Sequence, residues 1–537
     1  MKQFHLLVLL FWGMANGLTG QTLSTSTLPI VKIETQGQEV PDEPKITARL
    51  SIINKGAGQL NSIGDPANVY EGVIGIERRG ASSGYYPQAS YAIETRLDNG
   101  EERPVSLFDW PEESDFCLIS NYNDRSMLRN ILAYRTFQQM GHYAPRHQLV
   151  EVTLNGQYRG IYLLCERIKR DKGRVDIAKL GPEELEGDAL TGGYIIKVDY
   201  FDASNSWQGA FPAAGRPIHY VYYYPKPEDI QIQQKNYIQN YVYNFEKALY
   251  GNKFTDSLTG YRAYIDLTSF IDYLIVQELT RNIDGFKKSS YFWKAKDSDG
   301  GRLHAGPVWD FDWALKNIDE CDIFRATDGS GYAYLINNCN GDLPAPGWFT
   351  RMLSDTFFEN QLRCRYDSLR KTTLSTANIH HFMDSMALSL QIAQTRHFAR
   401  WAILGQNTGT PEVPPIPATY NAEINKLKTW LQLRLSWLDK NMPGRCGPTP
   451  SPEPPKPPLR LAPNPVLGGE TLVEGRTFNQ TDYRLYDVAG RLVRGLTRFA
   501  DDHGAIDVSS LPAGVYLVEL AWVDGMPLGK RLKLVVY

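Results

Sequence analysis

Three aspartates flank a short predicted hairpin in the middle of this 537-residue chain. Asp284 comes before the strand-like residues 290–296, and the strand-like residues 302–309 lead directly into Asp310 and Asp312. Because a β-hairpin brings its two ends together, we expect Asp284 to approach Asp310 in space. Phosphoryl transfer uses such an arrangement, since one carboxylate takes the proton of the acceptor hydroxyl and another holds the magnesium ion that bridges the phosphates.

The elements around these acids follow a recognisable order. A predicted helix over 266–280, which Asp266 or Thr268 can cap, is followed by Asp284, the hairpin and Asp310. Protein kinases place their catalytic and metal-binding aspartates in the same order. Magnesium binds through few carboxylates plus phosphate oxygens and water, so a sparse acidic set suffices. Turn and capping chemistry remains an alternative explanation for these aspartates.

The rest of the chain predicts an α+β fold, because strands and helices are both plentiful but do not alternate regularly. A hairpin is predicted over 150–164, where Asn155 and Gly156 suit a turn with positive φ. The other predicted strands lie at 30–34, 45–53 and 70–78, and the other predicted helices at 126–140 and 237–249.

Composition shifts divide the chain into four parts. Residues 1–20 have the order of a secretory signal peptide, with cleavage expected near Gly20. The proline-rich residues 447–458 predict an extended linker. They separate a large region, 22–446, from a tail, 459–537, in which short strands and turns predict a small all-β sandwich of the immunoglobulin-like kind.

Charge and cysteine content limit the possible partners. The formal net charge is −3 and no basic stripe is present, so nucleic acid is not an expected partner. No later apolar run approaches the ~20 residues that span a bilayer, so no transmembrane segment is expected. Of the six cysteines, Cys321 and Cys339 are the best disulfide candidates, and others could be buried free thiols.

Six spaced blocks of the large region belong together: Asp124-Arg-Ser-Met-Leu-Arg-Asn130, Leu154-Asn-Gly-Gln-Tyr-Arg-Gly-Ile-Tyr162, Glu166-Arg-Ile-Lys-Arg-Asp171, Gly192-Gly-Tyr-Ile-Ile-Lys197, Asn282-Ile-Asp284 and Gly306-Pro-Val-Trp-Asp-Phe-Asp312. In this order they resemble the CotH kinase family, which is named for a bacterial spore-coat protein. The resemblance implies an atypical kinase fold, ATP with Mg²⁺ or Mn²⁺ as cosubstrate and cofactor, and phosphorylation of exported proteins.

The resemblance assigns roles around the acids. Asp284 matches the catalytic acid, Asp310 matches the metal-binding acid, and Asp312 is expected to help it. Asn282 is expected to orient Asp284 or to touch the metal. Lys197, which ends a strand-like segment, is expected to pair with the α- and β-phosphates.

The other candidate nucleotide-binding residues each allow a second interpretation. Lys169 is the rival to Lys197, and Glu166 either holds the chosen lysine or simply ends the hairpin. The loop at Asn155 and Gly156 could cover the nucleotide, as a glycine-rich loop does in protein kinases. Arg129 could contact phosphate or form a structural ion pair.

Two departures from the family's pattern bear on activity. Family members often carry paired lysines before the Ser-Tyr of an early strand, where this chain has Pro87-Gln-Ala-Ser-Tyr91. Ser289 stands where protein kinases place a metal-binding asparagine. A non-catalytic surface-binding or adhesion protein is therefore the first alternative, and a carbohydrate-active enzyme, suggested by the many aromatic residues and the paired acids, is the second.

Four short motifs mark the tail: Ala462-Pro-Asn-Pro465, Tyr486-Asp-Val-Ala-Gly-Arg491, Ser510-Leu-Pro-Ala-Gly-Val-Tyr516 and Lys533-Leu-Val-Val536. With them the tail resembles the C-terminal sorting domain of the type IX secretion system. Such a tail implies the outer-membrane secretion machinery as a partner and a secreted or cell-surface protein. An ordinary immunoglobulin-like binding module is the alternative.

Overall fold

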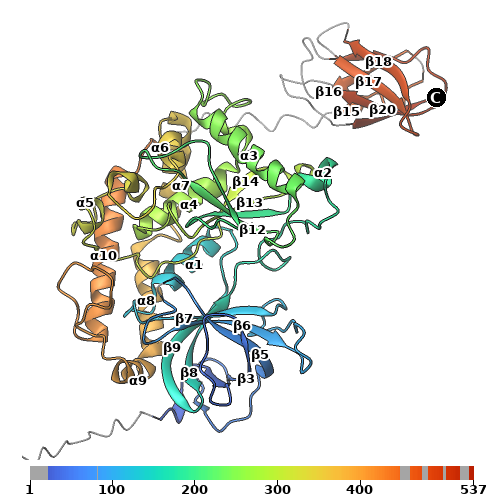
Figure 1. Cartoon of the computed structure of the whole chain (residues 1–537). Coiled ribbons are helices and arrows are strands. Elements are labelled where there is room, and N and C mark those ends of the chain that lie inside the picture. The colour runs from blue at the N-terminus through green and yellow to red at the C-terminus, as the bar shows by residue number, and fades with distance from the viewer. Residues whose placement is uncertain are drawn as a thin grey trace, which may run out of the picture. The chain divides into compact units, whose positions relative to one another are not determined.

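The computed structural model divides the chain into two compact units, residues 1–252 with 264–444, and residues 253–263 with 445–537 (Figure 1). The predicted signal peptide and nearly all of the predicted linker lie outside the residues that the structure describes. These described residues are 22–81, 83–447, 460–467, 469–474, 482–499, 504–520 and 531–537.

A closed seven-stranded barrel forms the first part of the large unit, with strand order β2-β3-β5-β6-β7-β9-β8. Parallel pairing of β2 with β8 closes the barrel, with Ile30 opposite Glu151. The predicted strands near the N-terminus and the predicted hairpin all belong to it. The barrel strands are β2 (Ile30–Glu34), β3 (Ile46–Ile53), β5 (Tyr70–Arg79), β6 (Ser90–Arg96), β7 (Asp115–Ser120), β8 (His147–Leu154) and β9 (Gln157–Glu166), and a short pair, β1 (Thr25–Ser26) with β4 (Asn61–Ser62), lies outside it.

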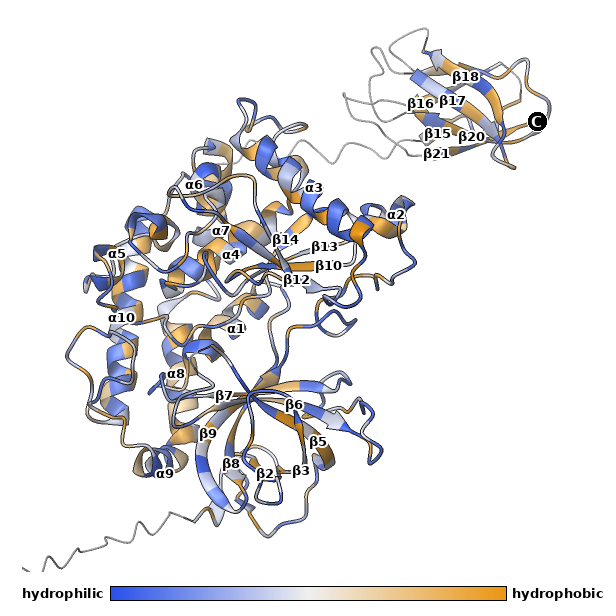
Figure 2. Cartoon of the chain, viewed as in Figure 1, coloured by the Kyte–Doolittle hydropathy of each residue, from blue (hydrophilic) through white to orange (hydrophobic). Residues whose placement is uncertain are grey.

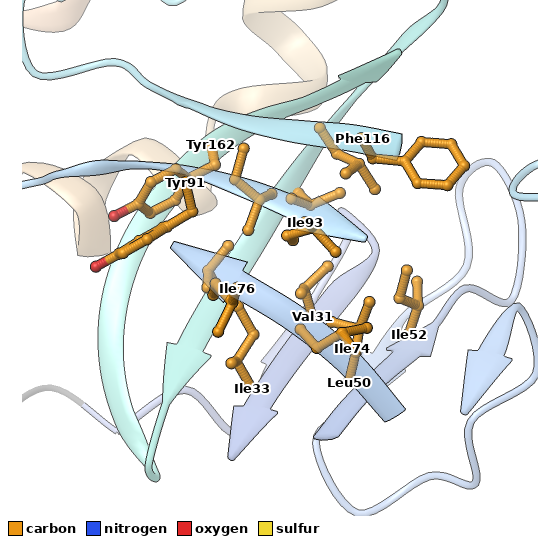
Figure 3. Packing of buried hydrophobic residues seen from close by; sticks show 14 of the residues in the cluster. Val31, Ile33, Leu50, Ile52, Ile74, Ile76, Tyr91, Ile93, Phe116 and Tyr162 are labelled. Atoms are coloured by element: carbon orange, nitrogen blue, oxygen red, sulfur yellow. The ribbon is translucent and has the colours of Figure 1, made fainter. Parts of the chain in front are cut away.

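Alternate residues of each barrel strand fill the interior. Ile74 and Ile76 of β5 meet Tyr91 and Ile93 of β6 in one apolar core (Figure 3). Because strand side chains alternate between faces, Arg79, three positions after Ile76, belongs to the outer face of the barrel. The outer face of β5 therefore carries a cation.

A five-stranded antiparallel sheet and a set of helices complete the large unit. Figure 1 shows the barrel on one side of this unit, and the helix α4 and strands β12–β14 on the other. The sheet order is β11 (Ser206–Gln208), β12 (His219–Tyr224), β10 (Tyr194–Val198), β13 (Ser290–Lys294) and β14 (Leu303–Ala305). The helices are α1 (Arg129–Gln139), α2 (Gly187–Leu190), α3 (Ile232–Tyr250), α4 (Leu267–Thr280), α5 (Asp322–Arg325), α6 (Trp348–Met352), α7 (Thr356–Arg370), α8 (Thr376–Leu390), α9 (Ala393–Arg400) and α10 (Tyr420–Asn441).

Helix α4 is the central helix of this part. The carboxylate of Asp266 caps it by accepting a hydrogen bond of 2.8 Å from the Ser269 N–H, as the sequence predicts. Nearly every residue from Ser269 to Thr280 is buried. Helices α3 and α10 instead carry both polar and apolar bands, as expected when one face is packed and the other is solvated (Figure 2). Among the residues that the structure describes, no helix is both long and apolar enough to cross a membrane.

The described part of the tail is all-β and has its own apolar core, to which Leu485, Ile506, Val518 and Leu534 belong. The all-β prediction is confirmed there, while the immunoglobulin-like topology stays a prediction. One sheet is β15 (Arg460–Ala462), β16 (Glu470–Glu474) and β19 (Ala505–Asp507), and the other is β18 (Leu492–Arg498), β17 (Asp482–Asp487), β20 (Gly514–Leu520) and β21 (Arg531–Val536).

The α+β class is confirmed, whereas the kinase-like architecture stays a prediction at the level of the fold. The disulfide between Cys321 and Cys339 is present, with the two Cα atoms 5.7 Å apart. Cys117 and Cys165 are buried free thiols that lie opposite each other on β7 and β9.

Candidate active site

The three aspartates of the hairpin line one cleft in the large unit. Helix α4 ends at Thr280, and the chain reaches Asp284 four residues later. Strands β13 and β14 then return the chain to Asp310 and Asp312. The cleft has a volume of about 1150 Å³, and all three carboxylate-bearing residues are part of its lining. Such a volume accommodates a ligand of nucleotide size.

The carboxylate of Asp310 lies in a crowded, buried position. Burial, followed by the charges of Asp312 and Asp284, raises its pKa to about 8. The Ser289 hydroxyl donates to Asp310 Oδ2 at 3.2 Å. The backbone φ of Asp310 is +69°, a left-handed conformation that L-residues adopt at a cost of about 1–2 kcal/mol. Such local strain is concentrated at functional sites.

Asp312 is held by a side chain that is far away in the sequence. The Asn123 side-chain amide donates to Asp312 Oδ2 at 3.2 Å. Asn123 is itself buried, and its amide oxygen accepts hydrogen bonds from the hydroxyls of Thr408 and Thr410. The position of the Asp312 carboxylate therefore depends on a chain of buried contacts.

Asp284 faces two lysines that follow it in the same turn. Its Oδ1 lies 3.5 Å from Lys287 Nζ and 3.3 Å from Lys288 Nζ. Burial raises the pKa of Asp284, although both lysines act against that shift. Asp342 contacts the same two ammonium groups, at 2.5 Å from Lys287 and 3.1 Å from Lys288. The cations beside Asp284 are therefore shared between two carboxylates.

Backbone contacts fix the turns that carry the acids. Asn282 Oδ1 accepts from the Asp284 N–H at 3.2 Å, and Asn282 Nδ2 donates to the Asp310 carbonyl at 3.3 Å. Asn282 thus ties the two ends of the hairpin together and does not itself line the cleft. Asn130 of α1 accepts from the Phe311 N–H at 2.8 Å. These two asparagines hold Asp284 and Asp310 in their relative positions.

Both candidate lysines line the cleft, and each is neutralised by acids. Lys197 at the end of β10 lies 2.6 Å from Asp199. Lys169 lies 2.9 Å from Glu113 and 2.7 Å from Asp115. The structure therefore does not single out Lys197 over Lys169.

Four other candidate nucleotide contacts are not among the residues that line the cleft. Asn155 and Gly156 form the predicted turn between β8 and β9, and Asn155 Oδ1 accepts from the Thr35 N–H at 2.8 Å. Glu166 is buried and accepts from Arg146 at 2.8 Å. These side chains have structural partners because the hairpin tip and the end of β9 belong to the barrel.

Arg129 belongs to a buried ion-pair network. Its guanidinium pairs with Asp124 and, at 3.0 Å, with Glu423. It also donates to the Ala314 carbonyl at 3.0 Å. The structural ion pair, which the sequence left open, is therefore the arrangement observed.

The sequence did not single out three residues that contact the site. Arg79 and Lys288 line the cleft, and Asn123 holds Asp312. Lys288 could have been found from its position four residues after Asp284. Arg79 and Asn123 carry no local signal, because only the closed barrel and the folded loop bring them to the acids.

The residues present fit a magnesium ion in part. Within the part of the chain that the structure describes, no group of three or more His, Cys, Asp or Glu side chains is arranged to hold a metal. Magnesium needs only one or two carboxylates when phosphate oxygens and water complete its shell. The mutual repulsion between Asp310 and Asp312 is the kind that a bound cation relieves.

Comparisons with known proteins identify a family for the large unit and for the tail. Residues 76–438, more than half of the chain, match the family model described as CotH kinase protein. Residues 460–526 match the model described as secretion system C-terminal sorting domain. No curated protein matches the chain. The matched sorting domain is that of the type IX system, so the protein is secreted or held at the cell surface, with the type IX secretion machinery as its partner.

Proposed function

The chain belongs to the CotH kinase family, and we propose that it is a secreted kinase that transfers the γ-phosphate of ATP to hydroxyl side chains of exported or surface proteins. A kinase-like architecture of the large unit and an immunoglobulin-like tail are part of this proposal. One observation carries the proposal: Asp284, Asp310 and Asp312, which come from the two ends of one hairpin, line a single cleft with Lys197 and Lys288.

The three acids divide the chemistry between them. Asp284 would accept the proton of the acceptor hydroxyl, and its raised pKa suits a general base. The acceptor oxygen forms a bond to the γ-phosphorus, the bond to the bridging oxygen breaks, and ADP leaves with that electron pair. Asp310 and Asp312 would hold Mg²⁺ or Mn²⁺, which supplies positive charge to the phosphate oxygens.

The lysines and Asn282 support this chemistry. Lys288 is close enough to Asp284 to keep its carboxylate oriented, and Lys288 lines the cleft together with the acids. Lys197 or Lys169 would meet the phosphates after exchanging its carboxylate partner for a phosphate oxygen. Asn282 acts as a positioning residue because it bonds both acid-bearing turns.

A transfer assay on the full chain tests the proposal. We expect wild type with [γ-³²P]ATP and Mg²⁺ or Mn²⁺ to label itself or an added acceptor protein. Asp284→Asn should lower the rate by about 10²–10⁴-fold, the usual contribution of a general base, while nucleotide binding is kept. Asp310→Ala should lose Mg²⁺-dependent nucleotide binding. The matched control is Asp299→Asn, because Asp299 is an exposed carboxylate at the tip of the same hairpin.

A nucleotide-binding surface protein without transfer activity is the second candidate. Ser289 favours it, because a hydroxyl that donates to Asp310 stands where protein kinases have a metal-binding asparagine. Binding of ATP without any transfer would support this candidate. Failure of wild type to bind or transfer under varied Mg²⁺ and Mn²⁺ would contradict both.

A further inference from the structure

The cations of the cleft differ in how they are neutralised. Lys288 has Asp284 and Asp342 as partners, and Lys197 has Asp199. Lys169, as described above, lies between two carboxylates, and Lys45 lies 3.2 Å from Glu94. Each of these lysines therefore has a carboxylate that a phosphate would have to displace.

Arg79 lies beside the acids and, like Arg170 and Lys226 of the same cleft, forms no ion pair among the described residues. Within the described residues, no carboxylate lies within ion-pair distance of its guanidinium, although it lines the cleft. The guanidinium instead lies over the ring of Trp309, 5.2 Å from the ring centroid. Trp309 is in turn stacked on Tyr134 of α1 at 6.0 Å. An aromatic face fixes the position of a guanidinium and leaves its positive charge available.

Arg79 lies close to the acids of the cleft. Trp309, on which it rests, is the residue directly before Asp310. The positive charge of Arg79 acts against the raised pKa of Asp310, which places the two groups within electrostatic reach. Arg170, another arginine of the cleft, lies instead over the ring of Tyr224, 5.7 Å from the ring centroid.

The barrel explains why a cation is found at this point. Arg79 is the last residue of β5 and pairs in register with Ser90, the first residue of β6. Ser90 also lines the cleft. The segment directly before Ser90, Pro87-Gln-Ala89, carries no cation. The neighbouring strand therefore supplies a cation close to the position where that segment has none.

We propose that Arg79 binds the polyphosphate of ATP, so that a phosphate contact comes from the end of β5 in addition to the contact proposed for Lys197 or Lys169. This inference rests on the proposed function, because it assigns a residue to the same site. The planar guanidinium can donate two parallel hydrogen bonds to phosphate oxygens. No carboxylate has to be displaced before it does so.

Nucleotide titrations on the full chain test this inference. We expect Arg79→Met to weaken ATP binding in the presence of Mg²⁺ by about tenfold to a hundredfold, the usual effect of losing a hydrogen bond to a charged group. Adenosine, which has no phosphate, should bind wild type and variant equally. Arg79→Lys should fall between them, since it keeps the charge but loses the two-pronged geometry.

Arg78→Met is the matched control. Arg78 is the neighbouring residue on β5, does not line the cleft, and pairs with Glu39 at 2.5 Å. The Arg78→Met variant should bind ATP with the affinity of wild type. Equal ATP affinity of wild type and Arg79→Met would overturn the inference alone, and so would an equal loss of ATP and adenosine binding. Absence of ATP binding by wild type would overturn the proposed function together with the inference.

Discussion

Two groups of charged residues in the large unit are built in opposite ways. The buried network joins Asp124, Arg125, Arg129, Glu412 and Glu423, and each member has an oppositely charged partner. The network connects the start of α1 and the segment before it with α10 and the segment before α10. Lys426 also pairs with Glu412, at 2.6 Å, so the network holds three carboxylates and three cations and needs no ligand.

The cleft cluster, by contrast, leaves charge unbalanced. We use this name for Asp284, Asp310, Asp312, Lys288 and Arg79. Burial and the charges of Asp312 and Asp284 oppose ionisation of Asp310. The guanidinium of Arg79 lies over the ring of Trp309, with no carboxylate within ion-pair distance among the described residues. The buried network compensates its charges internally. The cleft cluster does not, so a charged ligand can supply the missing compensation there. Arg129 lies in one of the sequence blocks that resemble the CotH family. It nevertheless belongs to the buried network and does not line the cleft.

The largest effect on stability is expected in the buried network. Arg129→Met leaves Asp124 and Glu423 buried without their shared partner, which should lower the free energy of unfolding by about 3–5 kcal/mol. A thermal melt followed by circular dichroism measures it. Arg135→Met on the same helix is the control, because Arg135 contacts the ring of Phe382 at 4.4 Å and should cost about 1 kcal/mol. Equal losses in both variants would contradict the comparison.

Acid should weaken the same network. Burial acts to raise the pKa of Glu412, but Lys316, Arg129 and Arg125 lower it to about 2. A lowered pKa contributes stability that is present above the unfolded value near 4.5 and is lost as pH falls from there towards 2. The loss should approach about 3 kcal/mol at the acid end.

Chemical unfolding of wild type and Glu412→Gln from pH 7 to pH 3 checks this expectation. The variant should be less stable at pH 7 and should show a shallower decline with acid. Parallel curves for the two proteins would show that Glu412 does not carry the acid sensitivity.

A smaller effect is expected where the two groups meet. Asn123→Ala removes the hydrogen bond to Asp312, so the Mg²⁺ concentration that supports half-maximal transfer should rise about threefold to tenfold. Asn121→Ala is the control, because Asn121 is also buried but donates to the Ile161 carbonyl of the barrel. Asn121→Ala should lower stability to a similar extent and leave the Mg²⁺ requirement unchanged. The same Mg²⁺ shift in both variants would mean that Asn123 acts only through stability.

Local sequence signals were sufficient for the elements that carry the acids. The cap at Asp266, the turn at Asn155 and Gly156, and the strand at 290–294 were all readable because each depends on neighbouring residues. Barrel closure was not readable, since it depends on β2 pairing with β8 more than 100 residues later. Hairpin geometry correctly predicted that Asp284 and Asp310 would share a cleft.

Side-chain partners across long sequence separations were harder to predict. Arg129 donates a hydrogen bond to Glu423, 294 residues away in the sequence, and Asn123 donates one to Asp312, 189 residues away. No periodicity links such pairs, because they depend on how whole elements pack. Arg79 could not be predicted for the same reason, because its position at the cleft depends on the outer face of a closed barrel.

The most direct test of the imbalance in the cleft is the melting temperature of Asp310→Asn, with and without ATP and Mg²⁺. Asparagine keeps the shape of the side chain and removes the carboxyl group whose ionisation burial, Asp312 and Asp284 oppose. We predict that the ligand-free variant melts at or above the temperature of wild type, and that the rise in melting temperature caused by ATP and Mg²⁺ is lost. A ligand-free variant that melts several degrees below wild type, with the ligand-induced rise retained, would contradict the account, because Asp310 would then be a structural carboxylate like those of the buried network.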